Sequence, residues 1–384
     1  MSPTTKNLTY NPNQLGSFSV ENKEKNASLL TLFGKWIQEI KDKKWFIRLT
    51  HKEFWDMPYL YPLIVFSYPY WAFRAKSWLF FTAANPGIET GGMTGESKAK
   101  INDMIPPPYR PQNVLISANE PRTTWQTRLE KAGIKFPLIA KPVVGARGLM
   151  VEKLQDMATL DAHITRFGVD FMIEEFIDYP IEAAVLYWKN PITEQSGISS
   201  ITIKKFLTVK GNNQDTVRNL LKQNFRGILQ IERLDKEKPA LMNSVPKCGA
   251  EIVVEPIGNH CRGTTFLNGN HLINGDMVKA FDTIQSHLGE CYFYRLDLKT
   301  PTIDDLQHGR NIKILEINGV GSEPAHIYDP QYPLWKIWRD TWLMWRKIYE
   351  IGEANHFLGV PYQTYSEFKE YVKTQDRYVK AGEQ

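Results

Sequence analysis

The sequence predicts an α+β protein with a ligand-binding cleft, and three observations carry that prediction. From about residue 111 onward, segments with helical periodicity alternate with segments typical of strands. Gly-rich and acidic stretches fall on the connections between them. The chain has 384 residues, 42% of them hydrophobic, which is enough to bury two or three cores or one large composite core. Such a mixture is typical of α+β or α/β proteins that bind a ligand between layers.

Charge and cysteine content exclude several classes of protein. The formal net charge of +5 forms no dense basic stripe, which argues against a nucleic-acid-binding protein. The cysteines Cys248, Cys261 and Cys291 form no CxxC pair, so the sequence predicts neither a disulfide scaffold nor a zinc site. The N-terminus has no charged-then-apolar signal pattern, and we expect a cytoplasmic protein.

The first part of the chain contains two unusual segments. Residues 1–28 are polar, and we expect a loose arm there, followed by a helix over 29–42. Residues 57–73 carry no charge, contain three prolines and fall short of the ~20 apolar residues that a membrane-spanning helix needs. Two interpretations are open for this segment: a buried, irregular part of the first domain, or an aromatic surface at a membrane interface.

Glycine and proline mark the domain organisation. The Gly-rich segment 85–98 and the proline-marked break 105–111 indicate a boundary near 105–115. We therefore expect a divergent N-terminal region over 1–110, a main domain over 111–330 and a Trp-rich helical tail over 331–384. In the main domain, periodicity predicts helices over 121–133, 155–167 and 215–224, and strands over 136–142, 171–177, 181–188, 198–209, 251–258, 292–299 and 312–318.

The sharpest chemical signal lies in the last two predicted strands. Arg295 and Asp297 are two residues apart, as are Glu316 and Asn318, so each pair shares one face of its strand. A carboxylate in an apolar strand is costly unless it is paired or ligated. Two carboxylates and an amide oxygen suit Mg²⁺ together with phosphate oxygens. The sequence therefore predicts a magnesium site at Asp297, Glu316 and Asn318, with structural ion pairs as the alternative.

Two further motifs are typical of nucleotide binding. Lys141 ends a predicted strand, and Gly145, Arg147 and Gly148 follow in a short loop whose backbone N–H groups can close on phosphate oxygens. An ordinary hairpin is the alternative there. Farther along, an apolar strand runs into an acidic segment whose backbone can read an adenine edge, with one carboxylate on the adenine amino group and another on the ribose. These residues are Glu174, Glu175, Phe176, Ile177 and, after the turn, Glu182. Taken by itself, the segment fits an amphipathic strand with acidic ends better, and this is the alternative.

Taken in order, these motifs resemble the ATP-grasp superfamily, and most closely its D-alanine–D-alanine ligase-like and cyanophycin-synthetase-like members. The resemblance covers about residues 95–330 and implies two α+β lobes that sandwich ATP. It implies that Lys141 contacts the ATP phosphates and that Glu174, with the backbone of Glu175 and Ile177, holds adenine. It also implies two Mg²⁺ ions, or Mn²⁺ in their place, at Asp297, Glu316 and Asn318, and an arginine, Arg295, that steadies the transferring phosphate.

The resemblance leaves two lysine positions open. Either Lys98 or Lys100 is the first ATP lysine of the family, and we assign Lys98. Either Lys204 or Lys205 reaches the terminal phosphate, and we assign Lys205 as the catalytic residue, with a solvated strand edge as the alternative.

Two polar clusters are candidates for substrate binding. Arginines suit a carboxylate, and acidic side chains suit an amine. The first 95 residues and the GVGSEP segment that follows Asn318 depart from the D-alanine ligase pattern, so the resemblance does not name D-alanine as a substrate. The candidate substrate residues are Arg226, His260, Arg262, Glu323 and His326, with Asp329 beside them.

The predicted activity is the ATP-dependent joining of a carboxylate to an amine through an acyl-phosphate. The expected partners are small-molecule or peptide substrates, and the resemblance is compatible with a homodimer. Three alternatives are an ATP-grasp kinase that stops at phosphoryl transfer, a non-catalytic ATP-binding module, and a membrane-associated scaffold built around residues 57–73.

Overall fold

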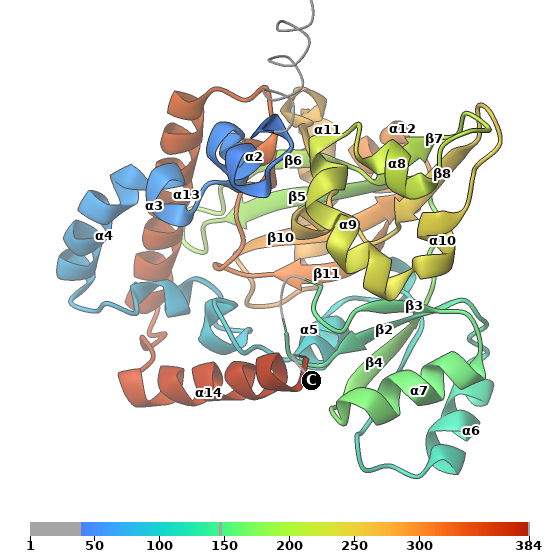
Figure 1. Cartoon of the computed structure of the whole chain (residues 1–384). Helices are drawn as coiled ribbons and strands as arrows, with labels where there is room; N and C mark the ends of the chain where they lie inside the picture. Colours follow the sequence, from blue (N-terminus) through green and yellow to red (C-terminus); the bar gives the residue numbers. More distant parts are fainter. Residues whose placement is uncertain (1–39, 146–147, 383–384) are drawn as a thin grey trace, which may run out of the picture.

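The computed structural model describes residues 40–145 and 148–382 (Figure 1). The predicted arm, most of the predicted helix over 29–42, and Arg147 lie outside these ranges. The described chain forms three antiparallel sheets with helices packed against them, which confirms the α+β class. The strand orders are β1-β4-β2-β3 in sheet A, β11-β10-β5-β6-β9 in sheet B and β7-β8 in sheet C.

Sheet A and two helices form the lower lobe in Figure 1. Helix α6 ends at Gly133, which has the left-handed conformation that glycine tolerates, and α7 begins with a capping box at Asp156. Leu138, Leu160 and Phe171 belong to the core of this lobe. The elements are β1 (Asn113–Ile116), α6 (Arg122–Ala132), β2 (Leu138–Pro142), β3 (Glu152–Leu154), α7 (Met157–Phe167) and β4 (Phe171–Glu175).

Sheet B is the centre of the molecule, and α11 packs against one of its faces (Figure 1). Val185, Leu296 and Phe281 are fully buried in the core between that face and the helix. The opposite face carries the polar side chains described below. The elements are β5 (Ile181–Lys189), β6 (Ser196–Lys205), β9 (Thr265–Asn268), α11 (Gly275–Gln285), β10 (Phe293–Thr300), α12 (Ile303–His308) and β11 (Lys313–Asn318).

Sheet C and three helices form a small unit with its own core around Leu221 and Val254. The strand predicted over 198–209 is two strands, β6 and β7, which pair with different partners. The helix predicted over 215–224 is shorter than predicted, because α8 ends at Leu221 and a new helix, α9, begins at Phe225 with Asn224 as its cap. The elements are β7 (Leu207–Lys210), α8 (Val217–Leu221), α9 (Phe225–Glu237), α10 (Pro239–Asn243) and β8 (Glu251–Glu255).

The remaining elements are six α-helices, mostly from the two ends of the described chain, and seven short 3₁₀ helices. The α-helices are α2 (Lys44–Thr50), α3 (Met57–Leu60), α4 (Pro62–Ala75), α5 (Lys98–Met104), α13 (Leu334–Phe357) and α14 (Tyr365–Gly382). The 3₁₀ helices are η1 (Lys52–Phe54), η2 (Phe80–Ala84), η3 (Glu89–Gly91), η4 (Pro107–Tyr109), η5 (His260–Arg262), η6 (Asn270–Leu272) and η7 (Ala325–Tyr328). None of the helices in the described ranges is long and apolar enough to cross a membrane.

The segment 57–73 is helical, so its interpretation as a buried, irregular segment is wrong. Pro58 and Pro62 stand at the first positions of α3 and α4, where a helix needs no N–H donor. One face of α4 packs on α13 through Trp71, which lies 6.1 Å from Trp342 between ring centroids. Much of the rest of α4 is exposed to solvent.

The Gly-rich segment 85–98 packs tightly against the chain that follows β11. The N–H groups of Val320 and Gly321 donate to the carbonyls of Gly91 and Gly92, each over 3.0 Å. The backbones approach so closely that a Cβ on Gly92 would lie 2.6 Å from the Cα of Gly319. This contact sets the start of α5, and with it Lys98, beside β11.

We expect Gly92→Ala to lower the free energy of unfolding by about 3 kcal/mol, because the added methyl group meets backbone that cannot move aside. Gly133→Ala is the matched control, since Gly133 also has a positive φ but a Cβ there meets nothing within 4 Å. It should cost only about 1 kcal/mol. Urea unfolding of both variants checks the difference, and equal losses would contradict the packing argument.

Candidate active site

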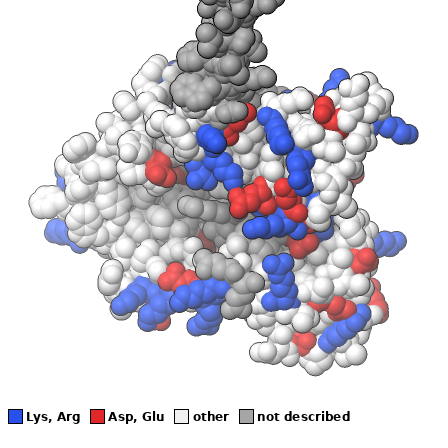
Figure 2. Space-filling model, viewed as in Figure 1, with Lys and Arg blue, Asp and Glu red and all other residues white. Residues whose placement is uncertain are grey.

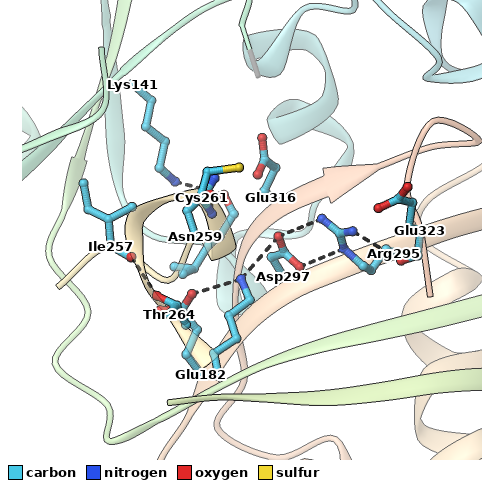
Figure 3. Close-up of polar contacts among 12 residues, drawn as sticks. Lys141, Glu182, Ile257, Asn259, Cys261, Thr264, Arg295, Asp297, Glu316 and Glu323 are labelled. Atoms are coloured by element: carbon cyan, nitrogen blue, oxygen red, sulfur yellow. Dashed lines mark hydrogen bonds and ion pairs between the residues drawn. The ribbon is translucent and has the colours of Figure 1, made fainter. Parts of the chain in front are cut away.

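Strands β10 and β11 present four polar side chains on one face of sheet B. Arg295 pairs in register with Asn318, and Asp297 with Glu316. The intervening pair, Leu296 and Ile317, points to the opposite face and belongs to the core. The guanidinium of Arg295 donates from Nε to Asp297 Oδ1 over 3.0 Å (Figure 3). Antiparallel pairing thus brings together the two motifs that the sequence analysis singled out separately.

Lys204 of β6 extends this polar face across the sheet. Its Nζ lies 3.0 Å from Glu182 Oε1 and 3.4 Å from Asp297 Oδ2. Lys204, Glu182 and Asp297 are all buried. Lys205 is exposed and follows Lys204 directly along the strand, so its side chain leaves from the other face. The structure therefore does not bring Lys205 to this cluster. Lys204 lies at the position that the sequence analysis gave to Lys205.

The cluster is ionised despite its burial. Burial alone would raise the pKa of Asp297, but the charges of Arg295 and Lys204 outweigh it and lower the pKa below its usual value. Burial alone would lower the pKa of Lys204, but Asp297 and Glu182 outweigh it and raise the pKa. Near neutral pH the carboxylate of Asp297 is therefore anionic and lies between the cations of Arg295 and Lys204, an arrangement that can bind both phosphate oxygens and a metal ion.

A second charged cluster lies between sheets A and B. Lys141 Nζ is 2.5 Å from Glu174 Oε2 and donates to the carbonyl of Leu315 over 3.0 Å. Lys98 forms an ion pair with Glu316, and this counterion lowers the pKa of Glu316 against the raising effect of burial. The cluster joins two lysines from the first half of the chain to the polar edge of β11.

The structure separates the two candidate lysines of α5. The side chain of Lys98 is 15% exposed and points to Glu316, whereas that of Lys100 is 74% exposed and pairs with Glu89. Lys98, as assigned from the sequence, is the one that lies in the cluster.

Glu174 is buried and only partly satisfied. It is 1% exposed, and its Oε1 has no hydrogen-bond partner within the described residues. A buried carboxylate oxygen without a donor is costly. The pKa of Glu174 is raised by burial, which prevails over the opposing charge of Lys141. This oxygen is therefore suited to accept a hydrogen bond from a bound ligand.

The segment after Glu174 links the two sheets. Glu175 Oε1 accepts from the backbone N–H of Gln112 over 3.0 Å. The ring of Phe176 lies under Lys153 Nζ, 3.4 Å from the ring centroid, and Lys299 donates to the carbonyl of Ile177 over 2.9 Å. These contacts fix the backbone of the linker, and the sequence analysis did not foresee the role of Lys153 or Lys299 in them.

The loop 257–264 faces this region from sheet C. Gly258 lies so close to Glu182 that an added Cβ would be 2.0 Å from its Oε1. Thr264 Oγ1 donates to the carbonyl of Ile257 over 3.2 Å and closes the loop. Figure 3 shows Asn259 and Cys261 of this loop in the view between Lys141 and Asp297. Gly145 and Gly148, in the predicted phosphate loop, both have positive φ, and a Cβ on Gly148 would lie 3.5 Å from Asn259 Nδ2.

Glu323 is the one predicted substrate residue that lies directly against the cluster. Its carbonyl accepts from Arg295 Nη1 over 3.3 Å, and its carboxylate accepts from the hydroxyls of Tyr61, over 2.6 Å, and Tyr328. Tyr61 comes from the uncharged segment 57–73, which the sequence analysis did not connect with the site.

The other predicted substrate residues have partners elsewhere. His326 is buried and bonded to Ser200 Oγ, at 2.7 Å, and to Asp340 Oδ2, at 3.1 Å. Arg262 lies 3.6 Å from Glu255, and Asp329 accepts from the backbone N–H of Asn268. The structure does not bring these three side chains to Asp297.

Arg226 and His260 form a neighbouring cluster of their own. Arg226 is buried and lies 3.1 Å from Glu53. Burial, aided by Arg226, lowers the pKa of His260 to about 3, so its ring is neutral at physiological pH. The ring of His260 packs on that of Tyr328, 5.1 Å away, which connects this cluster to Glu323.

The donor set that the sequence predicts for a metal ion is the carboxylates of Asp297 and Glu316 and the amide oxygen of Asn318. Within the described residues, no three His, Cys, Asp or Glu side chains are grouped so as to hold a metal by themselves. Asn318 Nδ2 is buried without a hydrogen-bond partner in those ranges. Hard oxygen donors at directly paired strand positions fit Mg²⁺ that completes its shell with phosphate oxygens and water.

No protein-family model and no curated protein matches the chain. Among solved structures, it is similar to the VanG D-Ala:D-Ser ligase from Enterococcus faecalis, with a TM-score of 0.38, 12% identity and coverage of 69% of this chain and 61% of that one. It is also similar to a bifunctional glutathione synthetase from Pasteurella multocida, with a TM-score of 0.35, 13% identity and coverage of 65% and 36%. A D-alanine–D-alanine ligase from Helicobacter pylori gives a TM-score of 0.34, 14% identity and coverage of 66% and 60%.

The matched regions span between 36% and 61% of these three enzymes' chains.

Proposed function

We propose that this protein is an ATP-dependent ligase that joins a carboxylate to an amine through an acyl-phosphate. The observation that carries the proposal is the ionised cluster on one face of sheet B, where Asp297 lies between Arg295 and Lys204 and pairs in register with Glu316. Fixed cations around two hard-oxygen donors are what phosphoryl transfer needs, because it depends on positioning and charge more than on a protein nucleophile.

In this proposal the nucleotide lies between sheets A and B. Glu174 Oε1 accepts from the adenine amino group, which would supply its missing partner. Glu182 accepts hydrogen bonds from the ribose hydroxyls, and Lys98 and Lys141 bind the phosphates. Lys98 already pairs with Glu316 of β11, and Lys141 with Glu174 on the neighbouring strand of its own sheet, so ATP binding exchanges these ion pairs for phosphate contacts.

Asp297, Glu316 and Asn318 would hold Mg²⁺, which when bound neutralises charge on the phosphate oxygens. Arg295 and Lys204 stand on the two sides of Asp297 and would hold the transferring phosphoryl group. The substrate carboxylate attacks that group and becomes an acyl-phosphate, which the amine then attacks with release of phosphate. Glu323, next to Arg295, is suited to attract the amine.

The direct test is the release of ADP and phosphate from Mg²⁺ and ATP, screened against pools of amino acids and short peptides. Release that depends on an added amine supports the ligase. A phosphorylated product formed without an amine would favour a kinase. Tight ATP binding with no turnover in any pool would contradict both and favour a binding module.

Glu174→Ala and its neighbour Glu175→Ala test the position of the adenine. We expect Glu174→Ala to weaken ATP binding by about 10- to 100-fold, because a buried hydrogen bond to a charged group is worth roughly 1.5–3 kcal/mol. Glu175→Ala should leave ATP affinity nearly unchanged, since its carboxylate bonds to the backbone of Gln112 instead. Isothermal titration of ATP into each variant measures the difference, and equal effects would argue against adenine at Glu174.

A further inference from the structure

Helix α4 is apolar on all sides but buries only one of them. Trp71, Ala72 and Ala75 pack inward. Leu63, Phe66, Tyr70 and Phe73 form an exposed stripe at helical spacing, and Phe66 and Phe73 are 80% and 81% exposed. A helix that is apolar all round is normally enclosed by other structure. The exposed half of α4 is therefore a candidate site for contact with another molecule or with a membrane.

The stripe is part of a larger surface, which we call the aromatic face: Tyr59, Leu63, Phe66, Tyr70, Phe73 and Trp78. All six side chains are at least 43% exposed. Figure 2 shows the left side of the molecule, where Figure 1 places α3 and α4, as an almost continuous area without charged side chains. The aromatic face lies on the outer edge of the molecule, with α13 between α4 and sheet B (Figure 1), so it is a convex ridge rather than a groove.

Exposed cations lie at both ends of this face, with the carboxylate of Asp56 at the start of α3 as the one acidic neighbour in the segment 57–78 and its N-cap. Residues 41–88 contain seven Lys and Arg against three Asp and Glu, so most of the formal net charge of +5 lies in this short segment. Arg74 and Lys76 are exposed at the end of α4 and form no ion pair within the described residues. At the other end α2, with its exposed cations Lys43 and Arg48, adjoins the face, because Trp55 bonds to the carbonyl of Leu49 and packs on Tyr59.

We propose that the aromatic face docks the protein on an anionic lipid bilayer, with α4 lying in the plane of the interface. A helix of 14 residues is about 21 Å long, too short to cross a hydrocarbon core of about 30 Å. Tyrosine and tryptophan rings favour the level of the lipid headgroups, and phenylalanine favours the acyl boundary below it. The cations at the two ends of the face, Arg74 and Lys76 at one and Lys43 and Arg48 at the other, complement anionic headgroups.

Vesicle flotation of the full-length protein tests the proposal. The vesicles contain phosphatidylcholine alone, or equal parts of phosphatidylcholine and phosphatidylglycerol. We expect the protein to float with the anionic vesicles, more weakly with the neutral ones, and less in high salt. The double variant Phe66→Asp, Phe73→Asp should lower the partition coefficient about 100-fold, roughly tenfold for each ring withdrawn from the interface.

Three variants keep the test specific. Phe66→Trp with Phe73→Trp should float like the unmodified protein, because tryptophan suits the interface. Val245→Asp removes an exposed apolar side chain (49% exposed) between α10 and β8, at the opposite side of Figure 1, and should also float normally. Arg74→Gln with Lys76→Gln should reduce binding to anionic vesicles and spare binding to neutral ones.

The proposal is overturned if the unmodified protein binds neither kind of vesicle. It is also overturned if the Phe66→Asp, Phe73→Asp variant floats with anionic vesicles as strongly as the unmodified protein. Analytical ultracentrifugation identifies the main competitor. If the unmodified protein self-associates, this variant does not, and neither binds vesicles, the aromatic face is a contact with a second copy of the chain. That result would refute the proposal of membrane binding.

Discussion

Asp297→Asn should reduce ATP turnover about 1000-fold while leaving the protein folded. The substitution keeps the size of the side chain but removes the charge that stands between Arg295 and Lys204. It also removes one of the two carboxylates proposed to hold Mg²⁺. ADP release, measured with the substrates found in the screen, gives the effect on kcat.

Loss of a buried ion pair also destabilises a protein, so this variant needs a matched control. Asp340→Asn provides one, because Asp340 is a largely buried carboxylate that pairs with His326 and Arg339 on a different part of the molecule. We expect both variants to melt at a lower temperature and only Asp297→Asn to lose turnover. If the two lost activity in proportion to stability, Asp297 would be structural and the proposed function would lose its main support.

Lys204→Met and Lys205→Met should differ sharply although the two residues are adjacent. Lys204→Met keeps the apolar stem but removes the charge beside Asp297 and Glu182, and we expect kcat to fall about 100-fold. Lys205→Met changes an exposed side chain on the other face of β6 and should leave kcat unchanged. The same ADP assay compares them.

The pair also decides between a catalytic and a purely structural role for Lys204. A structural role would lower the melting temperature of Lys204→Met without changing the kcat of the folded fraction. Equal activity of the two variants at a temperature where both are folded would remove Lys204 from the proposed mechanism.

The polar face of sheet B was predictable from the sequence because alternation along a strand is a local property. Arg295 and Asp297 share a face whatever their strand pairs with, and so do Glu316 and Asn318. The choice between Lys204 and Lys205 was also contained in the sequence. Ile201 and Ile203 belong to the core face of β6, which assigns Lys204 to the opposite face. The structure brings Lys204 rather than Lys205 to the cluster, and the role of either lysine toward a phosphate stays a prediction.

Other features depended on contacts between distant parts of the chain. The break between α8 and α9 depends on how the two helices pack, since a Cβ on Gly227 inside α9 would be 2.4 Å from the carbonyl oxygen of Leu221 at the end of α8. Tyr61 reaches Glu323 across 262 positions of sequence, and no local pattern announces such a contact. The prolines of segment 57–73 suggested irregular chain, whereas two of them begin helices.

The most direct test of the proposed function is to trap the acyl-phosphate with hydroxylamine, which stands in for the unknown amine. The protein is incubated with Mg²⁺, ATP, hydroxylamine and pools of carboxylates, and hydroxamate is measured together with ADP. We predict hydroxamate and ADP in equal amounts with at least one pool, and neither above background with Asp297→Asn. ADP formed with a phosphorylated alcohol or amine and no hydroxamate, or no ADP with any pool, would contradict a carboxylate–amine ligase.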